Sequence, residues 1–437
     1  MNKLTVIGGG LAGCEAAYAA ANRGIEVELL EMKPAKKTAA HKSDSLAELV
    51  CSNSLKAARV DSAAGLLKEE MRRLGSVCLA AADKSAVAAG GALAVDRDIF
   101  SRLITEKIKN HPNITVTERL VTEIPKGGVT VIATGPLTDD ALAEKLAGLC
   151  DGGNLSFYDA AAPIVTAESV DMSKAFFASR YDKGGDDYIN CPMNKEEYTA
   201  FYHELINAES APLHGFDKAP NVYEGCMPIE VLAKRGEDSI RFGPLKPVGL
   251  RDPRTGHRPW AAVQLRRENA AATLFNIVGF QTNLKFSEQK RVFSMIPGLE
   301  NAEFMRYGVM HRNTFINSPK MLNRNLSLKA DKNIFIAGQL SGVEGYMESA
   351  ASGIIAGINA AAEITGEKPL VLPETTMTGA LLSYITNPLT ENFQPMGANF
   401  GIIPPLEAHI RDKRERYAAL AARALGILAE NIKTEEI

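Results

Sequence analysis

The strongest constraint on the fold lies at the start of the chain. Leu4–Ile7 is a short apolar run rich in β-branched residues, and it leads into a glycine-rich turn at Gly8–Gly13. An alanine-rich stretch, Cys14–Asn22, has the composition of a helix, and Ile25–Leu30 alternates as a second strand. Strand, turn, helix and strand in this order form a βαβ unit, which predicts a parallel, doubly wound sheet.

The turn of this unit has the spacing of a dinucleotide-binding loop. Gly8 permits a tight turn, Gly10 leaves room for a pyrophosphate, and Gly13 allows the helix to pack closely on the strand. The free N–H groups of the helix N-terminus favour the phosphate charge. Glu31, at the tip of the second strand, is placed to accept hydrogen bonds from a ribose diol. We therefore expect the cofactor to contact Gly8, Gly9, Gly10, Leu11, Ala12, Gly13 and Glu31.

Two later motifs indicate which dinucleotide is bound. Thr134 and Gly135 follow the predicted strand Val129–Ala133, and Gly338 and Gln339 follow a second predicted strand. In order and spacing these motifs resemble the paired motifs of glutathione-reductase-type FAD proteins, which implies FAD as the cofactor. Many of those proteins have an aspartate where Gln339 stands here. The chain has no second GxGxxG unit, so we expect NADH or NADPH to visit the flavin only transiently.

The middle of the chain has a different texture, aromatic and broken by prolines, which begins near residue 186 and ends near residue 322. We therefore predict an α/β fold, with a glutathione-reductase-type Rossmann FAD-binding domain and an inserted α+β domain. The FAD-binding domain is expected in two parts, residues 1–185 and 323–437, and the insertion at residues 186–322. We also expect a helix at Leu55–Leu74, an ordered loop at residues 375–405 and an amphipathic helix at residues 406–431.

Composition and charge limit the class of protein. Apolar residues make up 46% of the 437 residues and no apolar run approaches the roughly 18 residues of a membrane span, so we expect a cytosolic protein. The six cysteines and seven histidines show no metal-ligand spacing, so no metal is expected. Net charge is −3, yet fourteen Lys and Arg stand against five Asp and Glu between Arg241 and Arg324. This surplus predicts an anionic partner for that segment.

Two cysteines lie in settings that suit a reactive thiol. Cys51 stands just ahead of the predicted helix at Leu55–Leu74, where the helix dipole would lower the pKa of its thiol. Cys226 lies between a glycine and a proline in a predicted loop of the insertion. Residue chemistry alone leaves packing as the commoner role for either side chain.

Longer strings identify a family. The segments ELVCSNSLKA, LLKEEMRRLGS, AGGALAVDR, YEGCMPIEVLA, FGPLKPVGL and GQLSGVEGYMESAASG closely resemble the folate- and FAD-dependent tRNA (uracil-5-)-methyltransferases of the TrmFO type. The likeness covers nearly the whole chain. It implies a one-carbon unit taken from methylenetetrahydrofolate, a flavin reduced by NADH or NADPH, and a methyl group placed on C5 of the T-loop uridine 54 of tRNA.

The resemblance also implies roles for particular residues. Cys226 matches the nucleophile of the family's YEGC motif, and a thiolate suits reversible addition to C6 of uracil. Cys51 matches a second family cysteine near the flavin, with a supporting or protective role. Tyr346 and Glu348 would lie at the flavin face. Trp260 of the basic segment is available for stacking on a base, and five arginines of the segment would bind RNA phosphates: Arg251, Arg254, Arg258, Arg266 and Arg267.

Three alternatives remain open at this point. The same chemistry could act on a uridine of 23S rRNA. The GQ-G-GY pattern at residues 338–346 is shared with the longer flavoenzymes of the GidA/MnmG type, which make carboxymethylaminomethyl-uridine. From another class, the chain could be a flavin- or folate-binding protein without catalysis that serves as an RNA-binding partner.

Overall fold

The parallel sheet at the start of the chain forms as the sequence predicts. The computed structural model describes residues 3–38, 40–148, 155–182, 185–212, 227–390 and 393–433. Its first sheet has the strand order β16-β7-β1-β2-β6, with every neighbouring pair parallel. The strands are β1 (Lys3–Ile7), β2 (Glu26–Glu31), β6 (Ile114–Glu118), β7 (Val129–Ile132) and β16 (Ile334–Ile336). This order confirms the predicted Rossmann-type α/β class.

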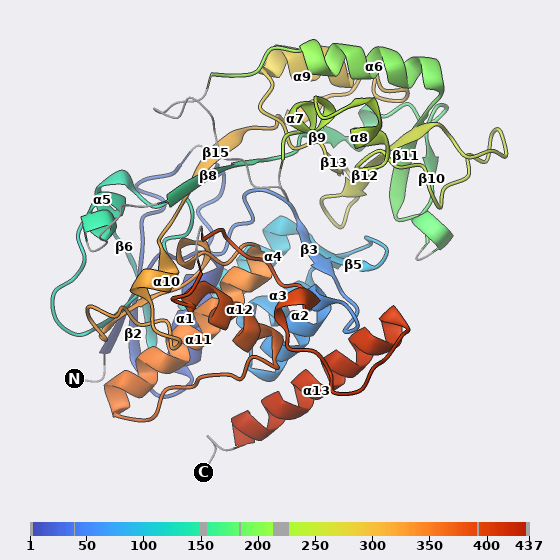
Figure 1. The fold of residues 1–437 in the computed structure, drawn as a ribbon. Helices are drawn as coiled ribbons and strands as arrows, with labels where there is room; N and C mark the ends of the chain where they lie inside the picture. The colour runs from blue at the N-terminus through green and yellow to red at the C-terminus, as the bar shows by residue number, and fades with distance from the viewer. Residues whose placement is uncertain are drawn as a thin grey trace.

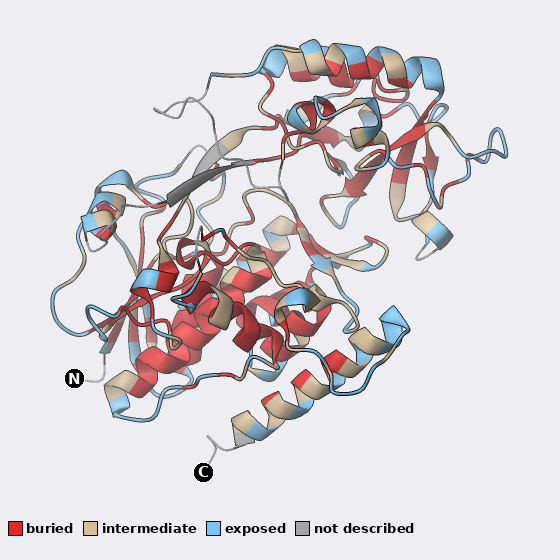
Figure 2. Ribbon diagram, viewed as in Figure 1, coloured by how far each residue is buried: buried red, intermediate tan, exposed pale blue. Residues whose placement is uncertain are grey.

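Two helices cover this sheet in unusually close contact. Helix α1 (Leu11–Ala21) and helix α11 (Tyr346–Thr365) both contact the sheet and pack against each other, and nearly all residues of α1 are buried. A Cβ atom on Gly353 would lie 2.2 Å from the carbonyl oxygen of Ala12, and one on Gly357 would lie 2.3 Å from that of Ala16. Because neither glycine has a side chain, the two helix backbones touch. Figures 1 and 2 show the pair as the buried centre of the domain.

The segment after Cys51 differs from the prediction. Residues Ser54–Ala57 form strand β3, and the following helix α2 (Ala63–Arg73) begins later than predicted. Strand β3 pairs with β5 (Ala92–Val95), which also pairs with β4 (Ala86–Val87). The Ser62 side chain accepts a hydrogen bond from the N–H of Gly65 and so caps α2. The predicted helix at Leu55–Leu74 is therefore wrong in its first turns. Helices α3 (Val77–Lys84), α4 (Arg97–Lys109) and α5 (Asp140–Gly148) complete this half.

A second sheet forms the body of the insertion, with the strand order β10-β11-β12-β13-β9-β14. Its neighbouring strands are antiparallel. Helices on one face of this sheet bury a separate apolar core (Figure 1). The strands are β9 (Ile164–Thr166), β10 (Phe176–Phe177), β11 (Tyr188–Met193), β12 (Ala261–Arg267), β13 (Leu274–Ile277) and β14 (Phe304–Arg306), and the helices are α6 (Lys195–Asn207), α7 (Ile229–Ala233), α8 (Glu237–Arg241) and α9 (Phe286–Phe293).

The insertion starts and ends earlier in the chain than the sequence texture suggests. Strands β9 and β10 precede residue 186 but belong to the second sheet. Strand β8 (Leu155–Ala160) pairs with β15 (Met310–Phe315), and this two-stranded ribbon connects the two bodies (Figure 1). We therefore propose residues 161–309 as the insertion in place of 186–322. The texture change marks the first exposed loops of the insertion, whereas its first strands are apolar like those of the other domain.

The last part of the chain returns to the first domain. Helices α10 (Ser318–Met321), α12 (Met377–Thr386) and α13 (Lys413–Lys433) pack there, and α13 crosses its outer side (Figure 1). Helix α12 lies within the predicted loop at residues 375–405, which corrects that prediction. Its start is held by Glu70, whose carboxylate accepts hydrogen bonds from the N–H groups of Met377 and Thr378. None of the helices in the described ranges is both long and apolar enough to span a bilayer.

A buried carboxyl group ties α1 to the start of α3. Glu15 is 1% exposed and accepts hydrogen bonds from the N–H groups of Val77 and Cys78, at 3.1 and 3.0 Å, and from the Ser76 hydroxyl. Burial raises its pKa from 4.5 to about 7 although these hydrogen bonds oppose the shift. Between these two pH values the folded chain holds a proton that the unfolded chain releases. The free energy of unfolding should therefore fall as pH rises through this window.

We expect Glu15→Gln to remove this pH dependence, because the amide does not titrate. The slope difference between parent and variant should approach about 1.4 kcal/mol per pH unit within the window. Urea unfolding at several pH values from 4.5 to 7 measures it. Glu26→Gln, at an exposed position of β2, is the matched control and should leave the slope of the parent unchanged. Equal slopes for the parent and Glu15→Gln would contradict the prediction.

Candidate cofactor and active site

Three adjoining pockets form one trench at the carboxyl ends of the parallel strands. The first is lined by the glycine turn and Glu31 and encloses about 620 Å³ of empty space, part of it open to solvent. The second, of about 900 Å³, shares Gly10 and Thr134 with the first and reaches Cys51 and Tyr346. The third, of about 1010 Å³, shares Cys51 and Tyr346 with the second. Because neighbouring pockets share lining residues, the three pockets together suit an extended ligand.

The glycine turn has the geometry that the sequence predicts. Gly8 has a φ of +101°, and a Cβ there would lie 2.6 Å from the carbonyl oxygen of Ala133. A Cβ on Gly13 would lie 1.7 Å from the carbonyl oxygen of Gly8. A Cβ on Gly10, by contrast, would have no atom within 4 Å of it. Packing therefore requires glycine at positions 8 and 13, whereas Gly10 leaves open space at the N-terminus of α1, where a phosphate would lie.

Glu31 does more than the sequence suggests. One of its carboxylate oxygens accepts a hydrogen bond from the N–H of Gly9 at 2.6 Å, and the other accepts one from the N–H of Lys33 at 2.9 Å. The side chain thus fastens the glycine turn to the end of β2. Each oxygen keeps a further lone pair for a ligand hydroxyl, and Glu31 lines the first pocket.

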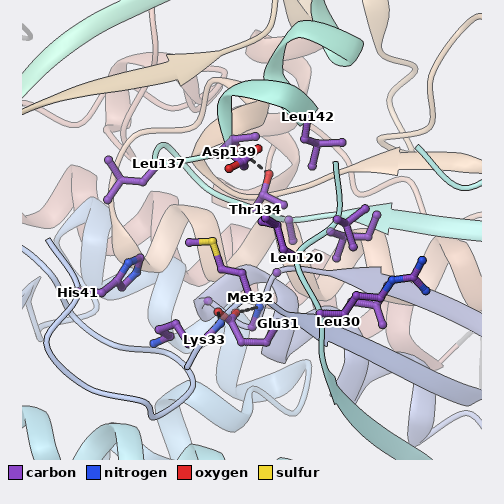
Figure 3. Close-up of a pocket in the computed structure, with 18 of the residues that line it drawn as sticks. Leu30, Glu31, Met32, Lys33, His41, Leu120, Thr134, Leu137, Asp139 and Leu142 are labelled. Atoms are coloured by element: carbon purple, nitrogen blue, oxygen red, sulfur yellow. Dashed lines mark hydrogen bonds between the residues drawn. The ribbon is translucent and has the colours of Figure 1, made fainter. Parts of the chain in front are cut away.

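Polar residues that the sequence motifs did not single out complete the first two pockets. His41 and Glu48 line both of them, and Asp139 lines the first. The His41 ring nitrogen Nδ1 lies 2.8 Å from the Thr38 hydroxyl, and burial lowers the pKa of this histidine. Figure 3 shows Glu31, Lys33 and His41 across the pocket from Thr134 and Asp139. These residues lie in loops of irregular spacing. The sequence signal for His41 and Glu48 is the density of polar residues after β2, and Asp139 lies directly before α5.

The two distal motifs meet the glycine turn in the second pocket. Gly135 and Gly338 have φ values of +70° and +75°, and Thr134 and Gly338 line the pocket beside Gly10. The amide nitrogen of Gln339 donates to the carboxylate of Glu344 at 2.6 Å. This side chain therefore already has a partner within the protein, while it still borders the second and third pockets.

Cys51 and Tyr346 lie side by side where the second and third pockets meet. The N–H of Cys51 donates to the Tyr346 hydroxyl oxygen at 2.7 Å. The Cys51 sulfur lies 3.7 Å from the carbonyl oxygen of Ala160. A strand and not a helix follows Cys51, so the predicted helix-dipole effect on its thiol is wrong. Cys226 lies outside the described residues.

A charge cluster around the buried Glu348 lies at the far end of the trench. Glu348 is 1% exposed, and its Oε1 accepts hydrogen bonds from the Lys56 ammonium at 2.7 Å and from the N–H of Ala398 at 3.1 Å. Its Oε2 has no hydrogen-bond partner within the described parts of the chain. Burial lowers the pKa of neighbouring Lys68 to about 8, and its ammonium donates to the carbonyl oxygen of Leu55. The sequence indicated Glu348 but not Lys56 or Lys68.

The arginines of the basic segment divide into two groups. Arg251 and Arg258 are exposed, as RNA contact requires, and Arg254 is exposed but paired with Asp252 at 2.7 Å. Arg266 is 7% exposed and Arg267 is half-buried, so Arg266 is not part of an external surface.

Trp260 is not a free stacking platform. The Arg241 guanidinium lies 3.7 Å from its ring centroid and the Lys195 ammonium 5.5 Å from it. Both contacts come from the same domain and are cation–π interactions, so the ring that the sequence offers for stacking on a base already has partners within the protein. Among the described residues, no group of three or more His, Cys, Asp or Glu side chains is placed to hold a metal ion.

Comparison with known proteins identifies relatives along the whole chain. Residues 3–368 match the family model described as Glucose inhibited division protein A. A methylenetetrahydrofolate--tRNA-(uracil-5-)-methyltransferase TrmFO of Lactobacillus gasseri is 57% identical over 436 residues, covering 100% of this chain and 99% of the relative. The protein of the same name from Acetivibrio thermocellus is 58% identical over 429 residues, covering 98% of each chain.

The fold also has a solved counterpart. GidA of Aquifex aeolicus, in its form I crystal, superposes with a TM-score of 0.71 at 18% identity, over 98% of this chain and 76% of that one. At this identity the likeness supports the fold alone. The full-length identity to the two TrmFO proteins is well above 50%, and it shows the family as well as the fold. The chain belongs to the family of the methylenetetrahydrofolate--tRNA-(uracil-5-)-methyltransferases of the TrmFO type, and it shares the fold of GidA.

Proposed function

We propose that this protein methylates C5 of uridine 54 in the T loop of tRNA, with methylenetetrahydrofolate as the carbon donor and FAD as the redox cofactor. The observation that carries this proposal is the 57% identity to a methyltransferase of that name across the full length of both chains. The trench supports it, because it combines a dinucleotide-type glycine turn in the first pocket with the Cys51 thiol where the second and third pockets meet.

The residues present fit FAD. The open space at Gly10 and the N-terminus of α1 would hold the pyrophosphate, and Glu31 would accept hydrogen bonds from the ribose. Thr134, Gly135, Gly338, Gln339 and Tyr346 line the second pocket, where the flavin end would lie. When bound and reduced by NADH or NADPH, FAD would carry the methylene group and supply the hydride that completes the methyl group.

Cys226 is the proposed nucleophile, on the strength of the YEGCMP string that contains it. Its thiolate would add to C6 of uracil and form an S–C6 bond, which pushes electron density onto C5. C5 would then form a bond to the donated methylene carbon. Loss of the C5 proton would break the bond between this carbon and its carrier and leave an exocyclic methylene on C5. Hydride addition to the methylene carbon would give the methyl group, and the electron pair would reform the C5–C6 double bond and expel the Cys226 thiolate, which breaks the S–C6 bond.

Two exposed arginines of the insertion are the proposed contacts for the phosphate backbone of the RNA. Arg251 and Arg258 project from the loop before β12, and neither has an ion-pair partner among the described residues. Guanidinium groups bind phosphate oxygens, and this attraction does not depend on the nucleotide sequence of the RNA. We assign tRNA contact to these two side chains.

Gly10→Val should abolish FAD binding with little change to the fold, since the added side chain would fill the phosphate position and no protein atom lies nearby. We expect FAD affinity to fall by about tenfold or more. Flavin absorbance after reconstitution, together with thermal unfolding of the apoprotein, measures both effects. Gly426→Ala, at another open position in α13, is the control and should keep FAD affinity. Normal flavin content in Gly10→Val would argue against this cofactor site.

Incubation with labelled methylenetetrahydrofolate, FAD and NADH or NADPH should transfer label to tRNA. Replacement of uridine 54 by cytidine in the tRNA should abolish transfer, because the target base is lost. A 23S rRNA fragment, tested in parallel, addresses the alternative substrate. Label on the rRNA alone would overturn the choice of tRNA, and label on neither RNA would leave the non-catalytic alternative in place.

tRNA that contains 5-fluorouridine should form a covalent adduct with the parent protein, because fluorine at C5 blocks proton loss. Cys226→Ala should lose this adduct, as measured by a mobility shift in denaturing gels. Cys191→Ala is the control, since Cys191 is fully buried in the core of the insertion. An adduct of unchanged yield in Cys226→Ala would show that another residue is the nucleophile.

A further inference from the structure

Guanidinium groups hold the loop that carries Cys51. Arg97, at the start of α4, donates to the carbonyl oxygen of Leu49 at 2.5 Å and to that of Cys51 at 2.8 Å. Arg306, on β14 of the insertion, donates to the carbonyl oxygen between them, that of Val50. Three consecutive carbonyl groups are therefore bound by two arginines from different domains.

A third arginine binds the next two residues of the loop. Arg266, on β12, donates from Nη2 to the Ser52 hydroxyl at 2.9 Å and from Nε to the side-chain oxygen of Asn53 at 3.0 Å. The Asn53 amide in turn donates to the carbonyl oxygens of Val95 and Arg267. We call Arg97, Arg266 and Arg306 the arginine cage.

The cage carries more positive charge than its carboxylate neighbour offsets. Glu268 pairs with Arg97 at 2.6 Å and is 4% exposed. Within the described ranges, no other carboxylate forms an ion pair with the three arginines, which leaves three positive charges against one negative charge. Charge that is buried without a counter-charge is costly, so this site favours a further anion.

Other acidic side chains near the loop are engaged elsewhere. Asp96 accepts hydrogen bonds from backbone N–H groups of α4 and of Ala270. Glu48 binds Lys33 and two backbone N–H groups, Glu344 binds Gln339, and Glu348 binds Lys56. His41 also borders the second pocket, and its lowered pKa favours the neutral ring.

Two ionisable groups face the cage from the trench, the Cys51 thiol and the Tyr346 phenol. Burial lowers the pKa of Arg266 and Arg306, and negative charge on Cys51 works in the opposite direction at both arginines, as it does at Arg97. A thiol ordinarily ionises near pH 8.5 and a phenol near pH 10.

The remaining described cysteines have the opposite setting. Cys14, Cys78 and Cys191 are fully buried, and burial raises the pKa of each thiol, that of Cys191 to about 12. Cys51 is only partly buried and lines two pockets of the trench. It combines access with positive charge, which is the environment of reactive thiols.

We propose that the arginine cage holds Cys51 as a thiolate at neutral pH, so that a negatively charged sulfur faces the trench. The proton passes to solvent, and the negative charge of the sulfur offsets the excess charge of the three guanidinium groups. This inference sharpens the supporting role proposed for Cys51. Its test needs no methyl transfer, so it can fail or succeed separately from the proposed function.

The test is the pH dependence of Cys51 alkylation by iodoacetamide in the protein as purified, with its flavin content measured and the labelled peptide identified by mass spectrometry. We expect half-maximal reactivity at least about one pH unit below the ordinary cysteine value. Arg306→Gln keeps an N–H donor for the Val50 carbonyl but removes the charge, and should raise the midpoint by about one unit. Arg306→Lys keeps the charge and should retain the midpoint of the parent.

Arg251→Gln, at an exposed arginine remote from the loop contacts, is the control and should not move the midpoint. Thiolate absorbance in the far ultraviolet, taken as the difference between parent and Cys51→Ser, gives a second readout that needs no access to the reagent. A midpoint at the ordinary cysteine value in both readouts would overturn the proposal. So would equal midpoints in Arg306→Gln and Arg306→Lys, because charge would then have no effect.

Discussion

The backbone contact between α1 and α11 decides where the trench lies. Gly353 and Gly357 let α11 approach the backbone carbonyl groups of Ala12 and Ala16 so closely that no side chain fits between the helices. Both helices also contact the parallel sheet, so α1 is held by α11 and by the sheet. A methyl group at either glycine would push the helices apart, and the N-terminus of α1 would move with them. Helix α11 begins at Tyr346, whose hydroxyl binds the N–H of Cys51. The same helix contact therefore joins the proposed phosphate position at Gly10 and the Cys51 loop in one rigid unit.

The insertion is attached to this unit by more than its two-stranded ribbon. The loop at Leu49–Asn53 receives hydrogen bonds from β12 and β14 of the insertion and from α4 of the first domain. Ion pairing between Arg97 and Glu268 adds a contact across the same boundary. The loop that carries Cys51 is thus bound by side chains of both domains. Movement of the insertion would pull directly on the peptide groups beside this thiol.

The sequence predicted the parts of the protein that follow local rules. The βαβ unit, the glycine turn and Glu31 lie where the motif places them, because each glycine answers a local steric demand. The strand at Ser54–Ala57 could not be predicted, since its partner β5 lies far along the chain and its composition suits a helix. The boundaries of the insertion could not be predicted either, because the apolar strands of the two domains have similar composition. Charge counts likewise could not separate exposed Arg251 from Arg266, which is buried against Ser52 and Asn53.

Apolar residues could not replace Arg97 and Arg306, because these arginines bind backbone carbonyl groups. The carbonyl groups of Leu49, Val50 and Cys51 lie outside the helices and strands, and a buried carbonyl without a donor costs free energy. Neutral donors such as asparagine would satisfy them, as Asn53 does for Val95 and Arg267. Arginine reaches across the domain boundary and presents several N–H groups from one side chain, so two residues serve three carbonyls. The positive charge comes with that geometry, and the partly exposed thiol of Cys51 is the group beside the loop best placed to balance it.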